Sequence, residues 1–323
     1  MKRRIFCIAG AASTILIAGP AIAKSFPDKP IRLVVPFVAG GATDVVARIT
    51  ADALGKTLGQ AVIVDNKGGA SGSIGTMEVL RSPPDGYTLA LVTPSITASN
   101  PAINPNIPYN PTTDLTPIVN VVASPTVVVV GPEFPSNDYK KFVAEVKSHP
   151  GKYTYSSSGT GGILNLQMEL FKSATGLSIN HIPYRGAGPA VNDVIAGQIS
   201  MTYESVPSIL PFIRSGRLRP VVVLAPQRLK ELPDVPTFSE VGIKELDRMQ
   251  HFGIVGPKGL PDEIVRAVNE ATKAALNDPA VRKRFEERGV QVVGSTPAEF
   301  KEEIKHLYEQ MKSLVKEKNL TVD

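Results

Sequence analysis

The chain has 323 residues, 28 prolines, one cysteine and a formal net charge of +5. Without its first 23 residues it would keep 300 residues, with 32 basic and 30 acidic side chains, and no cysteine. That length suits about two domains. The lack of cysteine excludes disulfides, thiol catalysis and cysteine-ligated metals, and the near-neutral charge without a dense basic run does not support nucleic-acid binding.

The first 23 residues have the pattern of a secretory signal peptide. A basic start, Lys2-Arg3-Arg4, precedes an apolar segment at 5–18 and an A-x-A site at Ala21-Ile22-Ala23. The apolar segment is short for a membrane span, and Cys7 lies inside it, not at the cleavage point. We expect cleavage after Ala23 and no membrane insertion of the mature chain. A retained membrane anchor is the alternative.

Residues 31–49 predict a strand, a glycine turn and a helix. The apolar run 31–35 is typical of a buried strand, and Pro36 ends it. Gly40 and Gly41 favour a tight turn, and Thr43 and Asp44 are good N-cap types for a helix that runs to about residue 58. Free N–H groups at such a helix start favour an anion, so we interpret the turn as half of a carboxylate site. An ordinary strand-to-helix connection explains the glycines equally well.

The next elements alternate in the same way. Strands are expected at 62–64 and 87–92, with a glycine-rich loop at 66–75 between them. A β-rich run at 119–130 is broken by Ser124-Pro125, and its length suggests a strand that passes from one lobe to another.

The second half predicts strands at 152–156, 179–184, 199–203 and 218–225, with helices between them. The turn at 185–188 leads into a helix with Pro189 at its first position. A return strand at 252–255 precedes an amphipathic helix at 261–277 and a last helix that opens with a capping box, Thr296 to Glu299. Alternating strands and helices indicate parallel-rich sheets, here in two α/β lobes with a ligand cleft between them.

Enzyme signatures are close but incomplete. Residues 50–57, TADALGKT, lack the first glycine of a phosphate-binding loop and fall inside a helix. The four histidines are far apart without an H-E-x-x-H pattern, and no serine sits in G-x-S-x-G. We therefore expect no enzyme activity, no cofactor and no metal, although distant carboxylates can still meet in a fold.

Five motifs occur together in order: PFVAGGATD, DNKGGASGSIG, PDGYTL, PYRGAGPAVNDVIAGQ and LPDVPTFSEVG. With them the chain resembles the Bug family, the extracytoplasmic receptors of tripartite tricarboxylate transporters. The resemblance implies a periplasmic, monomeric solute-binding receptor that hands a small carboxylate to membrane permease subunits. It also implies a type II periplasmic binding protein fold, with domain 1 at 24–125 plus 249–323, domain 2 at 126–248 and the C-terminal helices on domain 1.

The resemblance implies a ligand held between two turns, in part through ordered waters. The first turn is matched by Phe37, Ala39, Gly40, Gly41, Ala42, Thr43 and Asp44. The second turn is matched by Tyr184, Arg185, Gly186, Ala187, Gly188 and Ala190. Ser95, Ser158, Gly159, Thr160 and Glu204 are expected on further strand ends that face the same cleft.

Roles within these turns are hypotheses. Backbone amides and Thr43 would hold a carboxylate, while Phe37 and Tyr184 would pack against its carbon skeleton. Arg185 could pair with a second carboxylate through its planar fork, or be a surface arginine. Glu204 replaces a common aspartate and could read an ammonium group, but we favour a salt bridge between domains. Asp44 and Asp193 are expected to brace their helices.

The sequence departs from the family pattern at Asn165, where a histidine is common, and at 249–251, where an aromatic-rich stretch is usual. These changes affect the identity of the ligand. Alternative functions are a secreted α/β enzyme acting on a small organic acid, a receptor of another transporter class, or the receptor of a sensor system.

Overall fold

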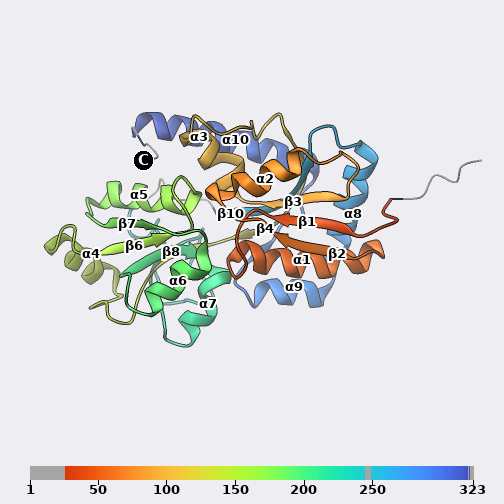
Figure 1. Cartoon of the computed structure of the whole chain (residues 1–323). Coiled ribbons are helices and arrows are strands. Elements are labelled where there is room, and N and C mark those ends of the chain that lie inside the picture. The colour runs from red at the N-terminus through yellow and green to blue at the C-terminus, as the bar shows by residue number, and fades with distance from the viewer. Residues whose placement is uncertain (1–25, 244–248, 319, 321–323) are drawn as a thin grey trace, which may run out of the picture.

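The computed structural model describes residues 26–243, 249–318 and 320. Two lobes, each a sheet with helices on both sides, lie next to each other (Figure 1). The predicted signal peptide and its cleavage site lie outside the described residues.

The first lobe contains a six-stranded sheet in the order β11-β4-β10-β3-β1-β2. Its strands are β1 (Ile31–Val35), β2 (Val62–Asn66), β3 (Thr88–Val92), β4 (Leu115–Ser124), β10 (Gln250–Pro257) and β11 (Gln291–Val292). Only β1 pairs in parallel, with β2 and β3, whereas β10 is antiparallel to both β3 and β4. The prediction of parallel-rich sheets is therefore wrong for half of this sheet, because a late strand of the chain returns into its centre.

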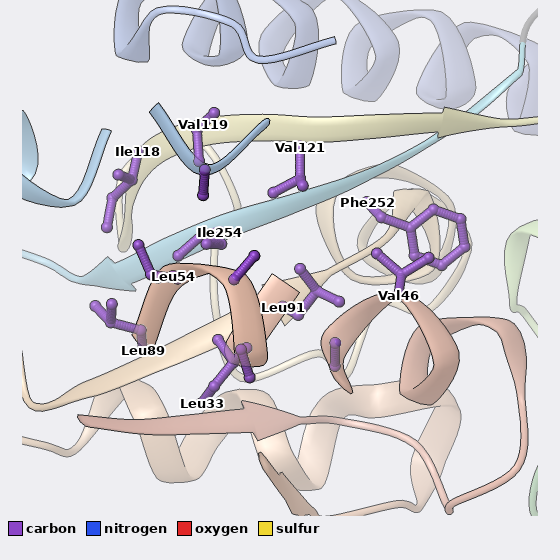
Figure 2. Close-up of a cluster of buried hydrophobic side chains, with 14 of the residues drawn as sticks. Leu33, Val46, Leu54, Leu89, Leu91, Ile118, Val119, Val121, Phe252 and Ile254 are labelled. Atoms are coloured by element: carbon purple, nitrogen blue, oxygen red, sulfur yellow. The ribbon is translucent and has the colours of Figure 1, made fainter. Parts of the chain in front are cut away.

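Helices of the first lobe cover both faces of this sheet. They are α1 (Ala42–Leu58), α2 (Ser73–Leu80), α3 (Asn100–Ile103), α8 (Asp262–Asn277) and α9 (Pro279–Glu286), with short turns η1 (Ala70–Gly72) and η2 (Ser95–Ser99). Figure 2 shows Leu54 of α1 beside Leu89 and Ile254 of the sheet, and Val46 of α1 beside Phe252. All five side chains are buried, so the predicted apolar face of α1 is the face that meets the core.

The second lobe contains a five-stranded mixed sheet in the order β7-β6-β8-β5-β9. Its strands are β5 (Thr126–Val130), β6 (Thr154–Ser157), β7 (Asn180–Pro183), β8 (Met201–Ser205) and β9 (Arg219–Leu224). Its helices are α4 (Tyr139–Ser148), α5 (Ile163–Thr175), α6 (Ala187–Ile195) and α7 (Val206–Arg214). An aromatic core that includes Phe142, Phe171 and Tyr203 fills one side of this sheet.

The predicted crossing between the lobes is confirmed at Pro125, because β4 belongs to the first sheet and the next strand, β5, to the second. The chain returns to the first sheet between β9 and β10. The predicted bounds of the domains, 24–125 with 249–323 and 126–248, stay a prediction that these two changes of sheet support.

The C-terminal helices α8, α9 and α10 (Pro297–Glu317) pack against α1, α3 and β4 of the first lobe, as expected. Phe300 and Ile304 pack in the first lobe, and Met311 belongs to a cluster that joins Ala98 and Ile103 of the first lobe to the aromatic core of the second lobe. A helix of 21 residues is roughly 30 Å long, which is enough to span both lobes. Figure 1 shows α10 running along the top of the molecule from the first lobe to a position above α5.

The start of α10 is capped as the sequence predicts. The Thr296 side chain accepts a hydrogen bond from the Glu299 N–H, and the Glu299 carboxylate accepts one from the Thr296 N–H at 2.8 Å. We expect Thr296→Ala to lower the free energy of unfolding by about 1 kcal/mol, measured by urea denaturation. Thr296→Ser keeps the hydroxyl and should be close to wild type. An alanine variant as stable as the serine variant would contradict a stabilising role for this cap.

Candidate functional site

Two adjoining cavities lie between the lobes and share Phe37 and Ser158 in their walls. The smaller one, which we name the inner chamber, has a volume of about 30 Å³. The larger one, which we name the outer cavity, has a volume of about 340 Å³. Both cavities are lined by strand ends and helix starts from the two lobes, which is where ligands of two-lobed α/β proteins usually bind.

The first turn lies between β1 and α1. Helix α1 starts at Ala42 with Gly41 as its N-cap residue and no side-chain cap, so the expectation that Thr43 or Asp44 caps the helix is wrong. Asp44 instead braces the turn from inside the helix, because its carboxylate accepts hydrogen bonds from the Gly40 N–H at 3.1 Å and from Arg48. Burial raises the pKa of Asp44, but hydrogen bonds from Arg48 and Gly40 outweigh it and leave the pKa lowered.

The second turn lies before α6, in the other lobe. Helix α6 starts at Ala187 with Gly186 as its N-cap residue, so Pro189 is its third residue and not its first as predicted. Tyr184 donates a hydrogen bond from its hydroxyl to Asp193, which braces the turn as expected.

The two turns meet across the cleft. A Cβ atom added at Gly41 would lie 3.2 Å from the Cβ of Ala187. A Cβ atom added at Gly186 would lie only 2.1 Å from Cγ2 of Val38. The uncapped starts of α1 and α6 therefore approach each other, and glycine is needed at 186 for this distance.

Four helix starts converge on the inner chamber. Its lining residues are Phe37, Val38, Gly41, Ala42, Thr43, Thr93, Ser95, Ser158, Ile163, Leu164, Ala187, Glu204, Ser205, Gln250 and Phe252. They include the first residues of α1, α5 and α6 and the N-cap residue of α7, Ser205. The starts of α1 and α6 have no side-chain cap for their first N–H groups, whereas the first N–H groups of α5 and α7 donate to Ser95 and to the Pro125 carbonyl. All four helix starts add partial positive charge, so the chamber is suited to an anionic group.

Glu204 is the acidic side chain of this chamber and is 2 % exposed. Burial raises the pKa of Glu204 to about 7, although a hydrogen bond from the Ser205 N–H to Oε1 at 2.8 Å opposes this effect. Among the described residues no cation forms a salt bridge with Glu204, so the preferred expectation of a salt bridge between domains finds no support there and stays a prediction. Glu204 lies at the end of β8, where its neighbours are helix starts and neutral polar groups.

The outer cavity continues from the chamber toward solvent. It is lined by Phe37, Gly69, Ala70, Ser71, Gly72, Asn100, Asn104, Ser158, Gly159, Thr160, Tyr184 and Arg185. Ala70 and Ser71 have positive φ angles of 47° and 50°, a region that costs about 1–2 kcal/mol for residues with a side chain. A hydrogen bond from Asn100 to the Ala70 carbonyl, at 3.2 Å, helps to hold this loop against the cavity.

Three serines of the first lobe bond to the backbone of residues 160–163 in the second lobe. Ser71 and Ser99 donate to the carbonyls of residues 160 and 161 at 2.6 and 3.1 Å. Ser95 accepts from the Ile163 N–H at 3.0 Å. These hydrogen bonds join the lobes on the side of the cavities where α5 begins.

Most of the predicted site residues line one of the two cavities. Ala39, Gly40 and Gly188 instead line a separate opening of about 450 Å³ on the outside of the two turns. Asp44, Gly186 and Ala190 are not among the described residues that line these cavities. Asp44 braces its turn, Gly186 allows the close approach to Val38, and Ala190 is buried in α6, where its carbonyl accepts a hydrogen bond from Ser156 at 3.2 Å.

Sequence reasoning missed part of both walls. The glycine-rich sequence at 69–72 predicts a loop but does not indicate that this loop lines the cleft. Thr93 and Gln250 carry no motif, and only the unusual composition at 249–251 pointed to the second of them.

The described residues form neither a metal-binding cluster nor a membrane-spanning helix. No group of three or more histidine, cysteine, aspartate or glutamate side chains there could hold a metal ion. Among the helices described, none combines the length and apolar character that crossing a bilayer requires.

Comparison with known proteins gives consistent results. The family described as "Tripartite tricarboxylate transporter family receptor" matches residues 46–320. Protein BugT of Bordetella pertussis is 38% identical over 298 residues, which cover 92% of this chain and 91% of BugT.

Two solved structures that carry ligands are also similar. An R. palustris protein with adipate has a TM-score of 0.86 and 30% identity, covering 90% of this chain and 97% of its own. MatC from Rhodopseudomonas palustris with bound malate has a TM-score of 0.85 and 28% identity, covering 90% of this chain and all of its own. The expected two-lobed α/β binding-protein fold is thus confirmed. The chain belongs to the tripartite tricarboxylate transporter receptor family, and within it to the Bug solute-binding receptors.

Proposed function

We propose that this receptor captures a small carboxylate in the inner chamber, with the rest of the ligand in the outer cavity. It acts in the periplasm as a monomer and delivers the ligand to the permease subunits of a tripartite transporter. The proposal rests above all on the convergence of four helix starts on one small chamber between the lobes. The adipate and malate in the two related structures support the same class of ligand.

Capture requires that the lobes open and close. The two turns belong to different lobes and are in van der Waals contact, so separation of the lobes would expose the chamber. A ligand that contacts both turns binds the closed arrangement better than the open one, and this difference in affinity drives closure.

A thermal-shift screen of the mature protein tests the proposal, after unfolding and refolding to remove carried-over ligand. The panel contains mono-, di- and tricarboxylates, acidic amino acids and neutral sugars. A ligand at about 100 times its dissociation constant stabilises the protein by roughly 2.7 kcal/mol. Stabilisation by one class of acids and not by sugars supports the proposal. If no acid stabilises the protein, the carboxylate site is wrong.

The receptor is not an enzyme in this proposal. The described residues of the cavities include neither a histidine nor a pair of carboxylates for acid–base chemistry. An identified ligand incubated with the protein for hours should give an unchanged NMR spectrum, whereas conversion of the ligand would favour the enzyme alternative.

Arg185 gives a prediction about ligands with two carboxylates. Its exposed side chain lines the outer cavity, where the far end of a ligand held in the inner chamber would lie. We expect Arg185→Ala to weaken binding of dicarboxylates by about tenfold, because a hydrogen bond to a charged group contributes about 1.5–3 kcal/mol. Monocarboxylates should lose little affinity, as measured by calorimetry. Arg266→Ala, on the exposed face of α8, is the control. Equal losses for both ligand classes would exclude this role.

A further inference from the structure

We propose that Glu204 and Gln250 select ligands with a hydrogen-bond donor, an ammonium or a hydroxyl group, on the carbon next to the captured carboxylate. This inference rests on the proposed function and adds a requirement to it. It concerns three polar side chains of the inner chamber, Glu204, Gln250 and Thr93, that a simple carboxylate would not fully satisfy.

The size of the chamber brings the ligand and Glu204 together. The residues that would hold the carboxylate, at the starts of α1 and α6, and Glu204 line the same space of about 30 Å³. This space admits only a small polar head group. The substituent closest to the bound carboxylate therefore faces the Glu204 side chain.

Glu204 has acceptor capacity left. Its Oε1 accepts one hydrogen bond, from the Ser205 N–H, while a carboxylate can accept about four. A donor on the ligand would use this capacity, whereas a second anionic group at the same place would be repelled. A ligand with only hydrogens on this carbon would leave the buried carboxyl group without that partner.

Gln250 adds an independent observation. Its side-chain oxygen accepts a hydrogen bond from the Ser205 hydroxyl at 3.1 Å, and this bond orients the amide. Its Nε2 is buried and has no hydrogen-bond partner among the described residues, and the same holds for the hydroxyl oxygen of Thr93. Buried polar groups without partners are costly, so a ligand oxygen that accepts from Gln250 gains affinity.

Acceptor and donor thus lie in one chamber at the ends of two strands from different lobes, β8 and β10. An ammonium or hydroxyl group would donate to Glu204, while the carboxylate or the hydroxyl oxygen would accept from Gln250. Glu204 and Gln250 would discriminate against an acid without an ammonium or hydroxyl group, because binding of that acid leaves buried polar groups unpaired.

The test uses three four-carbon dicarboxylates that differ only at carbon 2: succinate, malate and aspartate. If the ligand screen selects another carbon skeleton, the corresponding unsubstituted, hydroxy and amino acids are used. Calorimetry on the stripped mature protein should show at least about tenfold tighter binding of the hydroxy or the amino acid than of the unsubstituted acid.

Variants locate the effect. Glu204→Met removes the acceptor and should reduce the preference to less than about threefold, whereas Gln167→Met, in α5 and outside both cavities, should keep it. If the methionine variant does not fold, Glu204→Gln is measured instead. Glutamine keeps a hydrogen-bond acceptor but has no charge, so this variant should lose most of any preference for the amino acid. Equal binding of all three acids to the wild type overturns this inference alone, as does a variant that weakens all three equally. Failure of every acid to bind overturns the proposed function.

Discussion

Gly186→Ala should weaken ligand binding by about 5- to 150-fold, the range that corresponds to a cost of about 1–3 kcal/mol. The added Cβ atom would lie 2.1 Å from Cγ2 of Val38 in the other lobe. Valine cannot move this methyl group easily, because its side chain is restricted in χ1. The φ angle of Gly186 is 162°, an extended conformation that any residue adopts, so the variant should fold normally. The clash therefore acts on closure of the lobes and not on folding of either lobe.

Two further variants make this expectation specific. Val38→Ala removes the obstructing methyl groups, so the double variant Val38→Ala/Gly186→Ala should recover most of the affinity. Gly188→Ala is the matched control, since its Cβ atom would lie 3.6 Å from the Ala39 carbonyl oxygen, an ordinary contact. Affinity is measured by calorimetry and folding by thermal melting. Wild-type affinity in Gly186→Ala, or no recovery in the double variant, would show that the two turns do not meet when ligand binds.

Glu204→Gln should gain stability over the wild type as the pH rises. The free energy of unfolding of the variant minus that of the wild type should be about 3 kcal/mol larger at pH 8 than at pH 4. Burial raises the pKa of Glu204 from 4.5 to about 7. The native state therefore keeps this proton over a pH range in which the unfolded state has lost it. The contribution of this proton to the free energy of unfolding of the wild type is complete below pH 4.5 and is lost as the pH rises to about 7. The glutamine variant has no such loss.

The measurement is the free energy of urea unfolding of both proteins at several pH values between 4 and 8, without ligand. Other titrating groups cancel in the difference between the two proteins. Glu302→Gln, on the exposed face of α10, controls for the loss of one acidic residue. A difference that stays constant across this range would mean that Glu204 is ionised as easily in the folded as in the unfolded protein.

Local patterns predicted the two turns well. The apolar run 31–35 followed by Pro36 and two glycines identifies a strand that ends in a tight turn, and the structure has β1 and α1 there. Ser124-Pro125 marks the crossing between the lobes because proline cannot donate to a continuing strand ladder. The error at Thr43 and Asp44 arose because good cap residues also occur within the first turn of a helix, where Asp44 reaches back to Gly40.

The rest of the site depends on contacts between distant segments. Gln250 and Glu204 line the same chamber only because β10 returns into the first sheet, and no local periodicity specifies this insertion or its antiparallel direction. The same is true of the loop at 69–72, whose glycines indicate a turn but not the cavity that the turn faces. The extension of α10 along the first lobe toward the second follows from its length and from Met311, a residue that looks like any other apolar helix position.

The hydrogen bonds that Ser71, Ser95 and Ser99 form across the cleft have a consequence for transport. They join protein groups only, so their contribution to the closed arrangement is the same for every cargo and cancels when two cargoes are compared. What they set is residence time: stronger bonds at these serines would lengthen the dwell of all cargoes alike. A receptor must also release its ligand, so the stabilisation of the closed arrangement by these hydrogen bonds has an upper limit. The rate of transport therefore depends on having only a few such bonds, each of them weak.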